Sequence, residues 1–155
     1  MIGNFHKRFW IAFLALCCTL AFSQHSLTQD NTQPQKTGKL IVKVNGIRNT
    51  EGNIRVALRS DENTVVASQI VDIDPKTLTV EAVFDNLAER DYGVAVIHDE
   101  NKNGKLDFNE YGMPLEGYGH SNNPAKRQGP PDFNEIKFTF AAPGTTIAIN
   151  LIYWP

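Results

Sequence analysis

Residues 99–110 read DENKNGKLDFNE, and oxygen-bearing side chains recur through this stretch at fixed places. The spacing matches the D-x-[DN]-x-[DN]-G-x5-E pattern of a calcium-binding loop. Ca²⁺ takes about six to eight oxygen ligands, and such a loop supplies them from alternate residues around a glycine turn. The sequence therefore predicts one structural Ca²⁺ ion. Its expected ligands are Asp99, Asn101, Asn103, the backbone carbonyl of Lys105, Asp107 and Glu110.

The segments that flank this loop do not have the pattern of helices. The β-branched Val94, Val96 and Ile97 favour a strand before the loop. Pro114 and the neighbouring glycines interrupt any helix after it. Opening like a calcium sensor depends on paired helices, so a structural site is favoured over a switch. Two of the ligands are neutral asparagines, which lowers the charge of the site, and the expected dissociation constant is about 10⁻⁵–10⁻³ M.

Other interpretations of the loop stay open. Asn103-Gly104 alone is typical of a type I′ turn, so a plain polar hairpin is one alternative. Mg²⁺ is less favoured because it prefers a smaller octahedral shell. A zinc or copper site made by His98 and His120 is weaker still, since such sites usually take three or four soft ligands.

Residues 111–132 read YGMPLEGYGHSNNPAKRQGPPD and combine aromatic rings with His, Asn and Gly. A sugar or a peptide could bind to such rings, and the candidate ligand-binding residues are Tyr111, Tyr118, His120, Asn122 and Asn123. The alternative is structural, with tyrosines covering the end of the domain and asparagines bonded to backbone. No catalytic residue is predicted, because the chain has no G-x-S-x-G nucleophile elbow.

The elements that position these residues are short segments in which apolar residues recur at every second position. The first of these segments follows Lys39. This pattern predicts an all-β domain, a seven-stranded antiparallel β-sandwich of immunoglobulin-like or transthyretin-like type. Residues 99–132 contain no good strand and are expected to form one long ordered loop after the fifth strand. The expected strands are residues 40–47, 53–60, 65–71, 77–84, 91–98, 134–140 and 145–153.

The first 23 residues have the features of a secretory signal peptide. Lys7 and Arg8 precede an apolar run, and Ala21-Phe22-Ser23 is a small-x-small cleavage pattern. The apolar run is too short for a comfortable membrane span, which takes about 20 residues. We expect cleavage after Ser23 and export to the periplasm or the extracellular space. Lipid attachment at Cys17 or Cys18 is a weaker alternative.

After the leader, we expect a flexible linker at residues 24–37 and one domain at residues 38–155. Both cysteines lie in the leader, so the mature chain would hold its fold without disulfides. Without Lys7 and Arg8, 13 basic residues stand against 17 acidic ones. This mild negative charge argues against nucleic acid or anionic lipid as a partner. We expect no transmembrane span in the mature chain, and the sequence does not predict an oligomeric state.

Two resemblances follow from these motifs. HDENKNGKLDFNEYGMPLEGYGHSNNP, followed by FNEIKFTF and a closing strand, resembles a bacterial exported family called domain of unknown function 2141. The resemblance covers about residues 38–155 and implies a single exported domain with no established activity and no catalytic residue to transfer. NLAERDYGVAVIHDENKNG is also similar to transthyretin-like modules of bacterial surface proteins, some of which are calcium-stabilised stalks. This chain has one copy, so a stalk role is not expected.

Three functions follow, in order of preference. The first is a non-catalytic binding or scaffolding module of the cell envelope, which contacts a protein or a glycan through residues 111–132. The second is a purely structural exported protein. The third is an enzyme that acts on a carbohydrate or a peptide through the same loop, with His120 and nearby carboxylates.

Overall fold

The computed structural model describes residues 35–125 and 129–155. The expected signal peptide and residues 24–34 of the expected linker lie outside this part of the chain. Within the described residues, no helix has the length and the apolar character that a membrane crossing requires.

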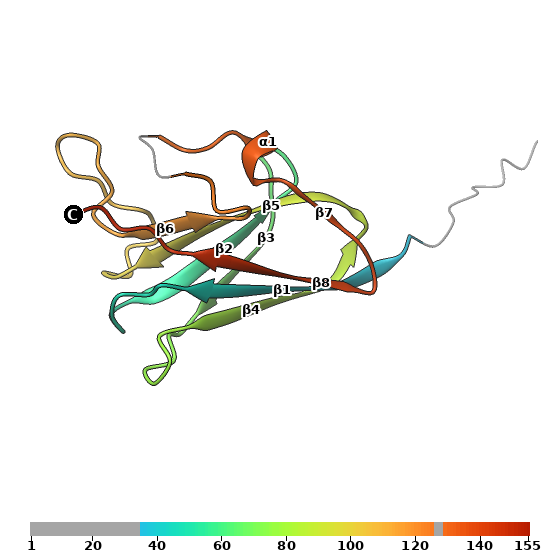
Figure 1. Ribbon diagram of the computed structural model, residues 1–155, viewed down its shortest axis with the longest axis horizontal. Coiled ribbons are helices and arrows are strands. Elements are labelled where there is room, and N and C mark those ends of the chain that lie inside the picture. Colours follow the sequence, from blue (N-terminus) through green and yellow to red (C-terminus); the bar gives the residue numbers. More distant parts are fainter. Residues whose placement is uncertain (1–34, 126–128) are drawn as a thin grey trace, which may run out of the picture. The chain divides into compact units, whose positions relative to one another are not determined.

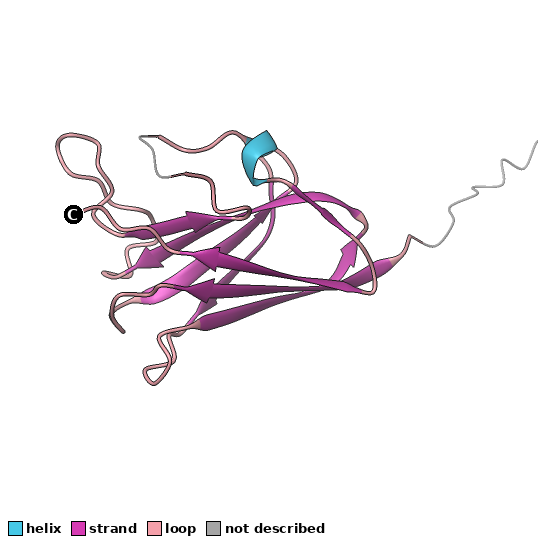
Figure 2. Ribbon diagram, viewed as in Figure 1, coloured by secondary structure: helices cyan, strands magenta, loops and turns pink. Residues whose placement is uncertain are grey.

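The described residues form two β-sheets and one short helix (Figures 1 and 2). One sheet has the strand order β4-β1-β8 and the other β3-β2-β5-β6, with β7 paired to β5. The expected all-β, two-sheet sandwich is therefore confirmed. The elements are β1 (Thr37–Asn45), β2 (Asn53–Arg59), β3 (Val65–Val71), β4 (Val80–Ala88), β5 (Arg90–Asp99), β6 (Gly117–His120), α1 (Phe133–Ile136), β7 (Phe138–Phe140) and β8 (Gly144–Asn150).

The core lies between the two sheets and follows from the period-two pattern. Successive side chains of a strand point to opposite faces, so every second apolar residue faces the partner sheet. Strand β1 buries Leu40, Val42 and Val44 completely. Strands β2 and β5 of the opposite sheet bury the apolar residues that face β1. The facing set from β2 and β5 is Ile54, Val56, Leu58, Val94 and Val96.

The strand count and the pairing differ from the prediction. Eight strands form among the described residues, because β6 lies inside the segment that was expected to be loop. The sheets are not purely antiparallel, since β1 pairs with β8 in parallel, with Val42 opposite Ile147. Residues 134–136 are helical rather than extended. The Glu135 carboxylate accepts a hydrogen bond from the backbone N–H of Asp132 at 3.0 Å, a contact typical of a capping box at a helix start.

Strand β6 needs its glycines because of what packs on its inner face. A Cβ atom at Gly117 would lie 2.3 Å from Cε1 of the Tyr153 ring. A Cβ atom at Gly119 would lie 2.7 Å from Cγ2 of Ile149. The C-terminal segment thus fills the space that two side chains of β6 would otherwise take. Tyr118 and His120 alternate with these glycines and face away from the core.

Candidate metal centre

The predicted calcium loop begins where β5 ends, at the pole of the sandwich near the C-terminus (Figure 1). Asp99 is completely buried. Its Oδ1 accepts a hydrogen bond from the backbone N–H of Asn103 at 2.9 Å, and its Oδ2 accepts one from Gly104 at 2.8 Å. Lys102 and Gly104 have φ values of 61° and 90°, which let the chain turn back over this carboxylate. The loop is therefore wound tightly around Asp99.

The other side chains of the loop meet at Asp107. The Nδ2 atoms of Asn101 and Asn103 both donate to Asp107 Oδ2, each at 2.6 Å. The pKa of Asp107 is lowered, chiefly by the hydrogen bond from Asn101 and then by that from Asn103 and the charge of Lys105. Four of the five expected side-chain ligands thus form one connected cluster, which consists of Asp99, Asn101, Asn103 and Asp107.

Two basic side chains also reach this cluster. Arg55 Nη1 on β2 lies 3.7 Å from Asp99 Oδ2, and Lys105 Nζ lies 3.6 Å from Asp107 Oδ1. A divalent cation would have to compete with both for the same oxygens.

Glu110, the expected twelfth-place ligand, lies apart from this cluster. Asn109 Oδ1 accepts hydrogen bonds from the backbone N–H groups of Tyr111 and Met113, each at 2.9 Å. These bonds form a turn closed by the Phe108–Pro114 bridge, and Glu110 is exposed within it. Among the described residues, no hydrogen bond or ion pair joins Glu110 to the other expected ligands.

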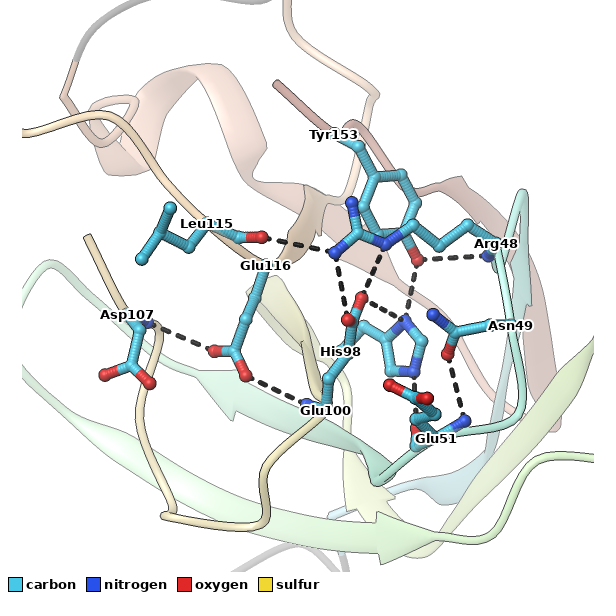
Figure 3. Close-up of polar contacts among 9 residues, drawn as sticks. All are labelled: Arg48, Asn49, Glu51, His98, Glu100, Asp107, Leu115, Glu116 and Tyr153. Atoms are coloured by element: carbon cyan, nitrogen blue, oxygen red, sulfur yellow. Dashed lines mark hydrogen bonds and ion pairs between the residues drawn. The ribbon is translucent and has the colours of Figure 1, made fainter. Parts of the chain in front are cut away.

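A different acid, Glu116, closes the loop. Its side chain is buried, Oε1 accepts a hydrogen bond from the backbone N–H of Glu100 at 2.9 Å, and Oε2 accepts one from Asp107 at 3.1 Å (Figure 3). The calcium-loop pattern gave no reason to select Glu116. The signal available in the sequence was an acid followed directly by the Gly-Tyr-Gly run of a strand.

Arg48 ties the two ends of the long loop together (Figure 3). Its Nε and Nη2 donate to Glu100 Oε1 and Oε2 at 2.7 and 2.9 Å, and Nη2 also donates to the Leu115 carbonyl at 3.3 Å. The guanidinium carbon lies 4.7 Å from the centre of the Tyr153 ring. Burial raises the pKa of Glu100, but the hydrogen bond and the charge of Arg48 outweigh it, and the net pKa is lowered.

The two histidines do not form a metal site together. His98 is completely buried on the inner face, with Nδ1 2.8 Å from the Tyr153 hydroxyl and Nε2 2.7 Å from the Glu51 carbonyl. His120 pairs with Ala95 on the outer face. Across residues 35–125 and 129–155, no group of three or more His, Cys, Asp or Glu side chains is placed to hold a metal ion. The cluster at the loop combines two carboxylates with two amides instead.

Tyr118 and His120 lie together on the outer face of β6, with ring centroids 6.2 Å apart. They border a pocket of about 230 Å³ on the outer face of the five-stranded sheet. The predicted calcium loop and the turn after it form one wall of this pocket through Leu106, Phe108 and Pro114. Tyr111, with 73% of its surface exposed, does not line it.

Asn122 and Asn123 are bonded to backbone. Asn122 Nδ2 donates to the carbonyls of Glu135 and Lys137 at 3.0 and 2.8 Å. Asn123 Nδ2 donates to the Ala148 carbonyl at 3.0 Å, and its Oδ1 accepts from the N–H of Asn150 at 2.8 Å. These contacts correspond to the structural interpretation of both residues, since they join the end of β6 to two distant segments.

The comparisons with known proteins give one match. A family model described as "Uncharacterized protein conserved in bacteria (DUF2141)" matches residues 42–148. The comparisons with curated proteins and with solved structures give no match.

Proposed function

Because the chain belongs to the DUF2141 family, whose description assigns no activity, we propose its function from the geometry of the loop. The protein is an exported, non-catalytic β-sandwich module of the cell envelope, and one Ca²⁺ ion orders its pole. Asp99, Asn101, Asn103 and Asp107 supply side-chain oxygens, and Lys105 supplies its carbonyl. Glu110 would join them only if the turn after Phe108 rearranged.

The observation that carries this proposal is the meeting of Asn101, Asn103 and Asp107. Both amides direct a donor at one carboxylate oxygen, so the three side chains already converge on a small volume. An amide carries an oxygen and a nitrogen on one carbon, and a half-turn exchanges them. A half-turn of both amides would bring two oxygens to face a common point, and it would break the hydrogen bonds that these oxygens now accept from the backbone N–H groups of Asn103 and Lys105, at 3.0 Å each. Amide oxygens are among the hard oxygen ligands that Ca²⁺ takes.

Such an ion would stabilise a domain that is expected to lack disulfides. Binding to the folded state alone adds RT ln(1 + [L]/Kd) to the free energy of unfolding. At a tenfold excess of Ca²⁺ over the dissociation constant this amounts to about 1.4 kcal/mol. The ion would mainly hold the loop between β5 and β6, which forms one wall of the outer pocket.

Thermal unfolding of the purified protein tests the proposal. The midpoint is expected to rise in millimolar Ca²⁺ relative to a chelator, and Asp107→Ala should abolish that rise. Asp61→Ala removes a carboxylate from the turn between β2 and β3 and should leave the rise intact. A wild-type midpoint that is the same in both buffers would refute the calcium site.

A second feature, the pocket on the outer face of the five-stranded sheet, supports a binding role for the module. Its lining is largely apolar, and Tyr118 and His120 stand at its border, so a ring of a sugar or an aromatic side chain is the ligand we expect. A glycan array and a peptide library would identify the ligand, and Tyr118→Ala should weaken its binding. Turnover that is lost in His120→Ala would favour the alternative, an enzyme acting on a carbohydrate or a peptide.

A further inference from the structure

Asn53, the first residue of β2, carries a buried oxygen that lacks a partner. The residue is 9% exposed, and its Oδ1 has no hydrogen-bond partner among the described residues. Buried polar atoms in folded proteins are nearly always hydrogen-bonded, so an exception calls for an explanation. An amide oxygen without a donor is available to a cation.

The pairing of β2 with β5 places Asn53 beside Asp99, the first residue of the candidate metal centre. Asn53 lies directly opposite Asp99 in the antiparallel register. Residues paired in this way share one face of the sheet, with Cβ atoms about 4.5–5.5 Å apart. Arg55, two residues further along β2, therefore points to the same face, and its guanidinium reaches Asp99 Oδ2. Asn53 stands closer in register to Asp99 than Arg55 does.

We propose that Asn53 Oδ1 is a further ligand of the cation held by the loop, contributed from the neighbouring strand. The inference rests on the proposed calcium site and adds to it a residue outside the loop pattern. An oxygen from β2 would join the loop to the sheet through the ion. It would also supply a ligand on the side of Asp99, whereas Glu110 lies in the turn beyond Phe108.

Asn53→Leu tests this inference, because leucine has a similar shape and no oxygen. Calorimetric titration of the purified variant with Ca²⁺ is expected to show affinity lower by about tenfold or more, since even second-shell partners of metals contribute about 10–100-fold. The melting midpoint in chelator should not fall, because the variant removes an oxygen that has no partner. Asn63→Leu, at an exposed turn position, is the matched control and should bind Ca²⁺ like the wild type.

Asn53→Asp supplies a second test that keeps the shape of the side chain. The added carboxylate should enlarge the rise in melting midpoint that Ca²⁺ produces. The inference is overturned if Asn53→Leu binds Ca²⁺ as the wild type does, or if Asn53→Asp shows no larger rise. It is also overturned if Asn53→Leu loses as much stability in chelator as in Ca²⁺, which would mark Asn53 as a hydrogen-bonding residue of the sheet. Absence of saturable binding by the wild type would instead refute the calcium site itself.

Discussion

The carboxylate of Glu116 accepts a hydrogen bond from the backbone N–H of Asp107, 3.1 Å away. Its other oxygen takes the N–H of Glu100, so one buried acid bridges the start and the end of the predicted calcium loop. Glu116 is also adjacent to Leu115, whose carbonyl accepts a hydrogen bond from Arg48. The hydrogen bonds of Glu116 and Arg48 therefore hold the loop in place, whether or not an ion occupies it.

Glu116→Gln should destabilise the protein by about 1–3 kcal/mol, because glutamine directs an N–H₂ group at one of two backbone donors. Urea unfolding in chelator measures this effect without a contribution from metal. Glu110→Gln makes the same chemical change at an exposed turn position and should stay within about 0.5 kcal/mol of the wild type. Equal losses in the two variants would show that Glu116 does not close the loop.

Arg55→Gln should strengthen calcium binding by about threefold to tenfold, because it removes a positive charge 3.7 Å from Asp99 Oδ2. Calorimetric titration with Ca²⁺ gives the affinity directly. Lys76→Gln changes the net charge equally at an exposed turn and corrects for the effect of overall charge. An unchanged or weaker affinity in Arg55→Gln would mean that Arg55 does not compete with the ion.

The sequence predicted the strands whose side chains alternate between the core and solvent. Strands β1, β2 and β5 show this pattern plainly, with valine, isoleucine and leucine on the buried face. The sequence pattern did not predict strand β6, because glycines occupy its buried positions and a residue without a side chain gives no apolar signal. The parallel pairing of β1 with β8 brings distant segments together, so no local pattern in either strand reports it.

The sequence predicted those residues of the candidate site that lie close together along the chain. Asp99, Asn101, Asn103 and Asp107 lie within nine consecutive residues, and the structure joins them. Glu110 fitted the spacing, but it lies within a turn that the side chain of Asn109 holds through hydrogen bonds from Tyr111 and Met113. Arg55 reaches Asp99 and Asn53 lies opposite it through the register of β2 on β5, which sequence spacing does not encode.

Gly117→Ala should destabilise the protein by about 1–3 kcal/mol, since the added Cβ would lie 2.3 Å from the Tyr153 ring. The ring would have to move away from the His98 nitrogen that lies 2.8 Å from its hydroxyl. Chemical denaturation of the variant measures the loss. Gly112→Ala, where no atom lies within 4 Å of the added Cβ, should show only the backbone strain of a positive φ, about 1 kcal/mol. A smaller effect at Gly117 than at Gly112 would contradict this packing.

Acidification should weaken the turn at Asp61. Its carboxylate accepts backbone N–H hydrogen bonds from Asn63 and Thr64, and the first of these is the main cause of its lowered pKa. The folded-state pKa lies below the ordinary value of 3.8, so this stabilisation is present above pH 3.8 and is lost as the pH falls through the folded value. Asp61→Asn should therefore show a shallower loss of stability below pH 3.8. Identical acid profiles for variant and wild type would exclude a contribution from this turn.

A crystal structure of the protein grown in millimolar Ca²⁺ tests the central claim most directly. The account predicts an ion bonded at about 2.3–2.6 Å by oxygens of Asp99, Asn101 and Asn103, with both amides rotated from their present contacts with Asp107. The contradicting result is a well-ordered loop in which both amides still donate to Asp107 and no ion lies beside Asp99.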